Sequence, residues 1–142
     1  MQSKAIKILI ALKLKQLKEL HPDFAYPPTP KYDDRTANGL TKCIIDFIEL
    51  RGFYATRINT MGIYDEKLGT YRKGTTKRGT ADIHACIKGK HLSIEVKIGA
   101  DAQSMYQEQT EQDIKKAGGI YLIARTFDGF INDIKTYFKD GK

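Results

Sequence analysis

Two acids and a lysine stand where chemistry could take place: Asp82, Glu95 and Lys97. They lie in residues 81–87 (ADIHACI) and 92–98 (LSIEVKI), where apolar side chains alternate with polar ones. Such alternation predicts two strands, each with one face in the core and one face turned away from it. The three ionisable side chains are therefore expected on one face of a hairpin.

The turn between the two strands decides how close the acids come. We expect a two-residue turn at residues 89–90, which places Asp82 opposite Lys97. The same register places His84 opposite Glu95, so that the two acids are diagonal neighbours. Diagonal neighbours are separated by about 7–8 Å between backbones, which lets two carboxylates converge on one ion. A register shifted by one residue would put the acids on opposite faces.

Carboxylates gathered on a strand face without partners cost free energy, so the arrangement favours a bound cation. A hard ion such as Mg²⁺ binds carboxylates, phosphate oxygens and water, polarises a phosphoryl group and lowers the pKa of bound water. Lys97 could position that water or neutralise charge that develops on the phosphate. A solvent-exposed hairpin face with an ion pair between Asp82 and Lys97 would explain the same pattern and contribute little stability. Spacing alone leaves both interpretations open.

The first part of the chain is expected to be an appendage. Residues 3–20 place leucines and isoleucines near helical spacing with lysines between them, which predicts a basic amphipathic helix. All four prolines follow within residues 22–30, which predicts an extended connector. We therefore divide the chain into a basic helix with a Pro-rich connector, residues 1–32, and a compact domain, residues 33–142.

Changes of periodicity predict the elements of the compact domain. A helical crossover should make the strand that follows it parallel to the second hairpin strand, while the hairpin itself is antiparallel. The expected fold class is α/β, with a mixed sheet flanked by helices. The expected order is a helix at 35–51 ended by Gly52, a strand at 53–59, a basic loop at 60–80, the hairpin, a helix at 104–117 capped by Ser104, a strand at 119–124 and a helix at 130–138.

The expected basic loop has the composition of a nucleic-acid contact. Lysines and arginines bind phosphates, and tyrosines stack on exposed bases. A plain solvated hairpin tip has a similar composition, but the position of the loop directly before the strand of Asp82 favours phosphate binding. The candidates are Arg72, Lys73, Lys77 and Arg78, with Tyr64 and Tyr71 nearby.

Composition and charge limit the classes of function. The chain has 142 residues, 41% of them hydrophobic and 29% charged, which is typical of one globular domain. Its net charge of +7 arises within residues 1–80, where 15 basic side chains accompany 8 acidic ones. This excess favours a polyanion such as DNA as the partner, although a solvated surface would carry it too.

Targeting signals and cysteine content indicate the cellular compartment. No apolar stretch approaches a bilayer span, and the apolar run at residues 6–12 is interrupted by a lysine, so we expect no membrane association and a cytoplasmic protein. The two cysteines, Cys43 and Cys86, lie in segments that read as a helix and a strand, so we expect neither a disulfide framework nor a four-ligand zinc site. We expect both to be reduced packing residues.

The order of the motifs resembles a known family. Together they resemble the PD-(D/E)XK nuclease superfamily, and within it the VRR-NUC branch, over about residues 36–126. An acid followed by E-x-K is a weak pattern by itself; the hydrophobic strands around it and the glutamine helix after it make it fairly specific. The motifs are Gly79-Thr80-Ala81-Asp82, Ile94-Glu95-Val96-Lys97, Gln107 and Ala117-Gly118-Gly119.

The resemblance implies a restriction-endonuclease-like core of order αβββαβ, here with an extra N-terminal helix. It also implies an endonuclease that hydrolyses DNA, in which Asp82, Glu95 and the main-chain carbonyl of Val96 bind Mg²⁺ or Mn²⁺. Lys97 would assist the attacking water, and Gln107 would face the site from its helix. A structure-specific enzyme of a phage or mobile element fits the family analogy.

Departures from the family pattern leave alternatives open. Ala81 stands where the family usually has proline, which removes no ligand. Asn38 stands where many members carry a glutamate, so it would bind metal only through its amide oxygen or a water. His84 is either a hydrogen-bond partner of the site or a structural residue. The alternative function is a nucleic-acid-binding module with weak or no catalysis, and a third is a structural partner protein whose basic N-terminal helix mediates assembly. A junction resolvase would need a symmetric homodimer, for which residues 3–20 are the obvious element.

Overall fold

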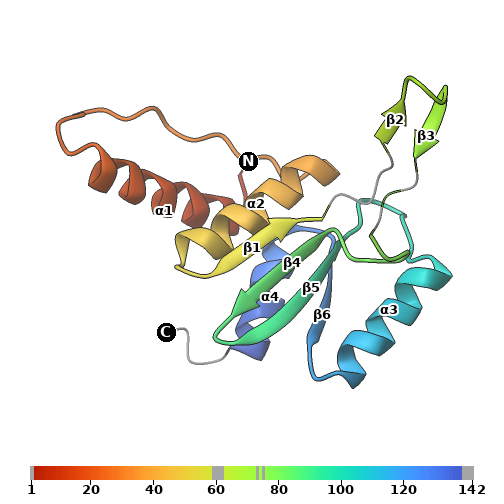
Figure 1. Ribbon diagram of the computed structural model, residues 1–142. Helices are drawn as coiled ribbons and strands as arrows, with labels where there is room; N and C mark the ends of the chain where they lie inside the picture. The colour runs from red at the N-terminus through yellow and green to blue at the C-terminus, as the bar shows by residue number, and fades with distance from the viewer. Residues whose placement is uncertain (1, 59–62, 73, 75, 139–142) are drawn as a thin grey trace.

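The computed structural model describes residues 2–58, 63–72, 74 and 76–138. Lys73, one of the expected phosphate contacts, lies outside them, and so does the side chain of Arg72. Figure 1 shows the elements in the order α1 (Lys4–Leu20), α2 (Ala37–Leu50), β1 (Tyr54–Arg57), β2 (Ile63–Asp65), β3 (Thr70–Arg72), β4 (Ile83–Ile87), β5 (Lys90–Val96), α3 (Met105–Lys116), β6 (Ile120–Ala124) and α4 (Phe127–Tyr137).

Four strands form the main sheet, in the order β1-β4-β5-β6. β4 pairs antiparallel with β1 and β5, and β5 pairs parallel with β6. The chain passes from β5 to β6 through α3, as a parallel pair requires. The expected α/β class, with a mixed sheet flanked by helices, is confirmed.

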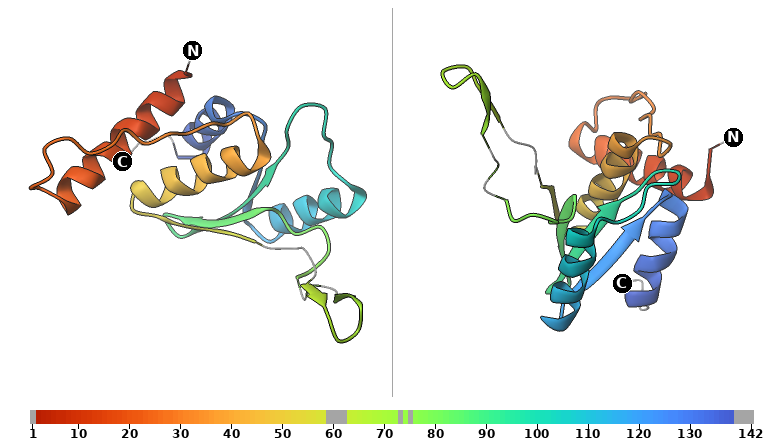
Figure 2. Two further views of the ribbon diagram at one scale, coloured as in Figure 1. Left: turned by 90° about the horizontal axis from the view of Figure 1, so that it is seen from above. Right: turned by 90° about the vertical axis from the view of Figure 1, so that its right-hand side faces the viewer.

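The two faces of the sheet differ in what covers them. Figure 2 shows α1, α2 and α4 on one side of the sheet and α3 on the other. On the α3 side the sheet buries Ser93 and Glu95 but leaves Cys86 exposed. The expectation that both cysteines are packing residues therefore holds for the buried Cys43 and is wrong for Cys86. The opposite face carries the hydrophobic core, to which the strands contribute Ala55, Ile83, Ala85, Leu92, Ile94 and Leu122.

The first half of α1 is part of this core. Ala5, Ile6 and Leu9 are buried in it, and the helix packs against α2 and α4. Asp128, at the start of α4, accepts a hydrogen bond from the backbone N–H of Ala5 at 3.2 Å. The last residue of the helix, Leu20, is exposed. Neither α1 nor another helix in the described ranges has the length and apolarity needed to cross a bilayer.

The turn of the β4-β5 hairpin lies one residue earlier than expected. Lys88 and Gly89 form it, with φ angles of 51° and 78°, and a two-residue type I′ turn requires two such left-handed residues. The expected turn at residues 89–90 is therefore wrong, and each residue of β4 pairs with a residue two positions earlier on β5. Because the shift is even, every side chain keeps its expected face.

Two further elements differ from the expected ones. Residues 63–72, expected to be loop, form an antiparallel hairpin, β2-β3, in which Tyr64 pairs with Tyr71. Its strands have only three residues each, too few for alternation to be recognised. α4 begins before residue 130 because the side chain of Thr126 caps it, accepting a hydrogen bond from the N–H of Gly129 at 3.0 Å.

Leu9→Ala should destabilise the whole protein, because Leu9 is 0% exposed and packs in the core. We expect a loss of about 2–5 kcal/mol in the free energy of unfolding, measured by urea denaturation. Leu20→Ala is the matched control at the other end of α1, where the side chain is 64% exposed, and should cost less than about 0.5 kcal/mol. Similar small effects of both substitutions would mean that α1 does not belong to the core.

Candidate functional site

The ends of β4 and β5 bring Asp82 and Glu95 together. Asp82 directly precedes β4, and its carbonyl accepts a hydrogen bond from the N–H of Ile58 at 2.7 Å, next to the end of β1. The observed register, continued by one step beyond β4, sets Asp82 opposite Glu95. The expected pairing of Asp82 with Lys97 is wrong because the turn lies one residue earlier. The two acids are direct neighbours across the strands rather than diagonal ones.

The backbone of β5 holds the carboxylate of Asp82. Its Oδ2 accepts a hydrogen bond from the N–H of Val96 at 2.8 Å. The N–H of the next residue, Lys97, donates at 2.9 Å to the carbonyl of Ala124 on the opposite neighbour, β6. Successive residues of a strand direct their main-chain groups to opposite sides, so the N–H and the carbonyl of Val96 both point to the side of Asp82. This is the carbonyl expected as a metal ligand.

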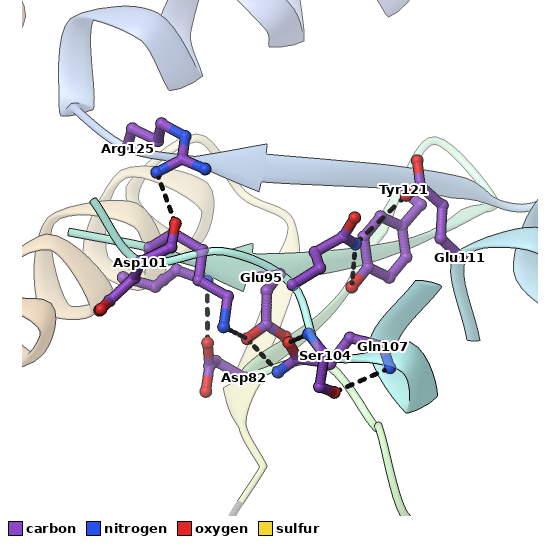
Figure 3. A network of polar contacts seen from close by, with 11 residues as sticks. Asp82, Glu95, Asp101, Ser104, Gln107, Glu111, Tyr121 and Arg125 are labelled. Carbon is purple, nitrogen blue, oxygen red and sulfur yellow. Dashed lines mark hydrogen bonds and ion pairs between the residues drawn. The ribbon is translucent and has the colours of Figure 1, made fainter. Parts of the chain in front are cut away.

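Glu95 is buried, with 2% of its surface exposed. Its Oε1 accepts a hydrogen bond from Nε2 of Gln107 at 2.7 Å and lies 3.5 Å from Nζ of Lys97. Its Oε2 is buried and has no hydrogen-bond partner among the described residues. Figure 3 shows the carboxylate near Asp82 and Gln107. An ionised carboxylate oxygen that is buried without a partner costs free energy, and either a proton shared with Asp82 or a bound cation would remove this cost.

The electrostatics of the site favour an added positive charge. Burial, and after it the negative charge of Asp82, raises the pKa of Glu95 to about 7, while Lys97 acts in the opposite direction. A single ammonium therefore does not compensate for the burial of Glu95 beside a second acid. A bound cation would favour the ionised form of Glu95 in the way that a proton favours its neutral form.

Gln107 joins the start of α3 to Glu95. The backbone N–H of Gln107 donates a hydrogen bond to Oγ of Ser104 at 3.2 Å. In return, the side-chain Oε1 of Gln107 accepts a hydrogen bond from the backbone N–H of Ser104 at 2.9 Å. This reciprocal pair is a capping box. Because the oxygen of the Gln107 amide is engaged by the cap, its NH₂ group is directed to Glu95. Gln107 was expected to face the site, and the structure brings it there.

The segment before Asp82 packs against the first turn of α3. The guanidinium carbon of Arg78 lies 3.9 Å from the centre of the Tyr106 ring. Gly79 has a φ of 85°, and the carbonyl of Tyr106 occupies the place that a Cβ would need, so only glycine permits this approach. Lys77 is exposed next to them. Lys77 and Arg78 are two of the four expected phosphate contacts. Both are among the described residues, and both lie a few positions before Asp82 in the sequence.

His84 is not paired with Glu95 across the strands. It pairs with Ser93, and its ring meets that of His91 edge to face with centroids 5.1 Å apart. Burial, and then the charge of His91, lowers the pKa of His84. The expected pairing of His84 with Glu95 is wrong for the same reason as that of Asp82, since the turn lies earlier. His84 shares the face of the acids but lies two residue pairs closer to the turn.

Asn38 lies at the same end of the sheet, but its side chain is hydrogen-bonded to the guanidinium group of Arg57. Asn38 lies in the first turn of α2, and its Oδ1 accepts a hydrogen bond from Nη2 of Arg57 at 2.9 Å. Arg57 pairs with Ile83, the residue after Asp82. The sequence did not indicate this partner, because Arg57 had been assigned only to a strand.

Further polar residues of the site were not identified from the sequence. Gln103 donates to Oε1 of Glu111 at 3.2 Å and to the hydroxyl of Tyr121 at 3.4 Å, beside the network of Glu95 in Figure 3. Arg125 donates to the carbonyl of Asp101 at 2.9 Å and so holds the loop between β5 and α3. Gln103 stands four residues before Gln107 in the sequence, a helical spacing, but it lies before the helix rather than on it.

The donor set fits a hard cation better than a structural zinc ion. Among the described residues there is no group of three or more His, Cys, Asp and Glu side chains that could hold a metal. Two carboxylates and a main-chain carbonyl, with water and phosphate oxygens, are the kind of ligands that Mg²⁺ takes. Structural zinc sites use four cysteine or histidine ligands.

No family model, no curated protein and no solved structure matches the chain. Inference about function therefore depends on the chemistry of Asp82, Glu95 and Lys97 and on the elements that position them.

Glu95→Gln should change how stability depends on pH in the presence of EDTA. The pKa of Glu95 is raised in the folded protein, so its contribution to stability is complete at low pH and is lost as the pH rises through about 7. Wild type should therefore lose about 1–3 kcal/mol relative to Glu95→Gln between pH 5 and pH 8, measured by urea denaturation. The exposed Glu66→Gln is the control and should run parallel to wild type. A wild-type curve parallel to that of Glu95→Gln would contradict a raised pKa.

Proposed function

We propose that the protein is a metal-dependent nuclease that hydrolyses DNA phosphodiester bonds. The observation that carries the proposal is the buried Oε2 of Glu95, which has no partner among the described residues although it lies on the strand next to a second acid, Asp82. Two ionised acids in this arrangement are unfavourable without a proton or a cation between them, and a divalent cation makes them useful for hydrolysis. It also distinguishes the site from an exposed ion pair on a hairpin.

The resemblance to the PD-(D/E)XK superfamily supports the same function. The elements α2, β1, β4, β5, α3 and β6 follow the order αβββαβ that the resemblance implies, with α1 as the extra N-terminal helix and β2-β3 as an insertion. Asp82 precedes β4, and Glu95 lies near the end of the neighbouring strand. We accordingly propose a restriction-endonuclease-like core and a cytoplasmic enzyme.

Asp82, Glu95 and the carbonyl of Val96 are the residues that would hold Mg²⁺ or Mn²⁺. When bound, such an ion supplies Lewis-acid polarisation of the phosphate and a water of lowered pKa. The N–H of Val96 keeps Asp82 in place, and Gln107 keeps Glu95 in place. Neither acid therefore has to be ordered when a ligand arrives.

Lys97 is the residue proposed to act on the reacting groups. Its side chain is 14% exposed, and its ammonium lies 3.5 Å from Oε1 of Glu95, so it is aimed at the site rather than at solvent. From there it can donate a hydrogen bond to a water or to a phosphate oxygen. An ammonium at that point stabilises the negative charge that develops on the phosphate during hydrolysis.

DNA is the proposed substrate because the chain places positive charge near the acids. Lys77 and Arg78 are exposed and precede Asp82 by a few residues. The net charge of +7 supports binding of a polyanion.

A nucleic-acid-binding module with weak or no catalysis is the second candidate. The observation in its favour is the engagement of Asn38 by Arg57, which leaves the first helix without an acid at the site. The same surface would then bind DNA without cutting it.

The first test is cleavage of labelled single-stranded, duplex, flapped and four-way-junction DNA with Mg²⁺, Mn²⁺ or EDTA. Asp82→Asn and Lys97→Met should each lower the cleavage rate by at least about a hundredfold, since each removes a charge from the reacting centre. Lys90→Met, on the exposed start of the same strand, is the matched control and should cut like wild type.

Cutting in EDTA, or cutting that survives Asp82→Asn, would overturn the metal-dependent mechanism. Salt-sensitive binding of DNA without cleavage of any substrate would favour the binding module.

Gln107→Ala should weaken the metal requirement rather than abolish cleavage. Removing a residue that orients a metal ligand typically lowers metal affinity by about 10- to 100-fold. We expect a corresponding rise in the Mg²⁺ concentration that gives half-maximal cleavage. Gln109→Ala, exposed on the same helix, is the control. An unchanged Mg²⁺ titration for Gln107→Ala would mean that its contact with Glu95 plays no part in ligand binding.

A further inference from the structure

The β2-β3 hairpin stands apart from the rest of the molecule. Figures 1 and 2 show it projecting away from the main sheet and the helices, and it forms a two-stranded sheet of its own. The chain enters it after β1 and leaves it toward β4, so it is inserted at the end of the sheet where Asp82 lies. An element in this place is carried next to the proposed cleavage site without being needed for the core.

One face of this hairpin carries a pair of exposed aromatic rings. Tyr64 and Tyr71, here called the tyrosine pair, lie opposite each other on the two strands, with centroids 5.2 Å apart and planes at 66°. They are 52% and 70% exposed. Leu68, in the turn, is exposed as well. Cross-strand contact between the rings stabilises the hairpin, and a large part of each ring still faces solvent.

The hairpin that carries the tyrosine pair and the segment that follows it differ in charge. Residues 63–72 contain two acidic and two basic side chains, so their formal charge is zero. Residues 73–80 contain three basic side chains and no acidic one. The hairpin, which includes only Arg72 of the four expected phosphate contacts, is therefore less suited to hold phosphates than the segment that returns from it to Asp82.

We propose that the tyrosine pair stacks on unpaired bases and that the enzyme acts on DNA with a single-stranded segment beside the cut. This inference rests on the proposed nuclease function and narrows its substrate. Exposed aromatic rings beside a basic segment are the combination that binds single strands without reading sequence. The outcome is a preference for branched or gapped DNA over a continuous duplex.

The dimensions of the chain allow one DNA to make both contacts. Asp82 lies eleven positions after Tyr71 in the chain, and eleven Cα–Cα steps span at most about 40 Å when fully extended. This upper bound corresponds to about a dozen steps of a DNA strand at 3.4 Å each. Unpaired bases on the tyrosine pair and a phosphate at Asp82 can thus belong to the same branch point.

The test compares wild type with a double substitution, Tyr64→Ala with Tyr71→Ala. Tyr64→Phe with Tyr71→Phe keeps both rings and serves as the matched control, and Tyr26→Ala removes a ring that is 90% exposed elsewhere. Two DNAs share one duplex sequence, and one of them carries a single-stranded flap that contains 2-aminopurine. Affinity and fluorescence are measured in EDTA, and cleavage is measured with Mg²⁺.

The double alanine variant should bind the flapped DNA at least fivefold more weakly and should lose the quenching of 2-aminopurine, since stacking of one base changes affinity by about 5- to 150-fold. Its affinity for the plain duplex should change less than twofold. The phenylalanine variant and Tyr26→Ala should match wild type on both DNAs.

Equal affinity of wild type and the alanine variant for flapped DNA would overturn the stacking proposal, and so would an equal loss on both DNAs. Equal affinity for flapped DNA would favour a protein partner for the hairpin. An equal loss on both DNAs would indicate that the tyrosines contact phosphates. These results are distinct from failure of the nuclease proposal, in which wild type cuts neither DNA with Mg²⁺. Loss of stacking by the alanine variant in that case would support base binding by a protein that does not cut.

Discussion

The burial of Glu95 is the constraint on which the rest of the site depends. A carboxylate can lie in the middle of a sheet only if its oxygens are satisfied or if the protein tolerates the cost. β5 lies between β4 and β6, with α3 on the face that carries Glu95, and only 2% of the surface of Glu95 is exposed. One oxygen is satisfied by Gln107, and the other has no hydrogen-bond partner among the described residues. Strand order, helix position and capping box therefore act together on a single side chain.

α3 has two functions in this arrangement. It is the crossover that makes β5 and β6 parallel, and its first turn forms one wall of the site. The close approach of Gly79 to Tyr106 and the contact of Arg78 with the same ring join the basic segment to that turn. The loop that leads into the helix is held by Arg125 from the end of β6. Elements distant in sequence thus fix the distance between the acids and the proposed phosphate contacts.

Alternation and capping rules predicted the sheet faces and the start of α3 because these depend on neighbouring residues. They placed Glu95 and Asp82 on one face and Ser104 at the cap. The register failed because both Gly89-Lys90 and Lys88-Gly89 offer a two-residue turn, and the choice depends on backbone angles that spacing does not encode. The partner of Asn38 and the burial of Glu95 arise from packing between distant segments, which no local pattern contains.

The charges of the site explain why a cation and a phosphate would belong together there. With both acids ionised and Lys97 protonated, the formal charge of the three groups is −1, which repels a phosphate. Taking up a proton on Glu95 brings this charge to zero, and holding a divalent cation with Glu95 ionised brings it to +1. Only the last state attracts a phosphodiester, because nearby charge dominates the field in such a site. In the proposed function, the buried acid would couple the binding of a cation to the binding of DNA, without a moving part in the protein.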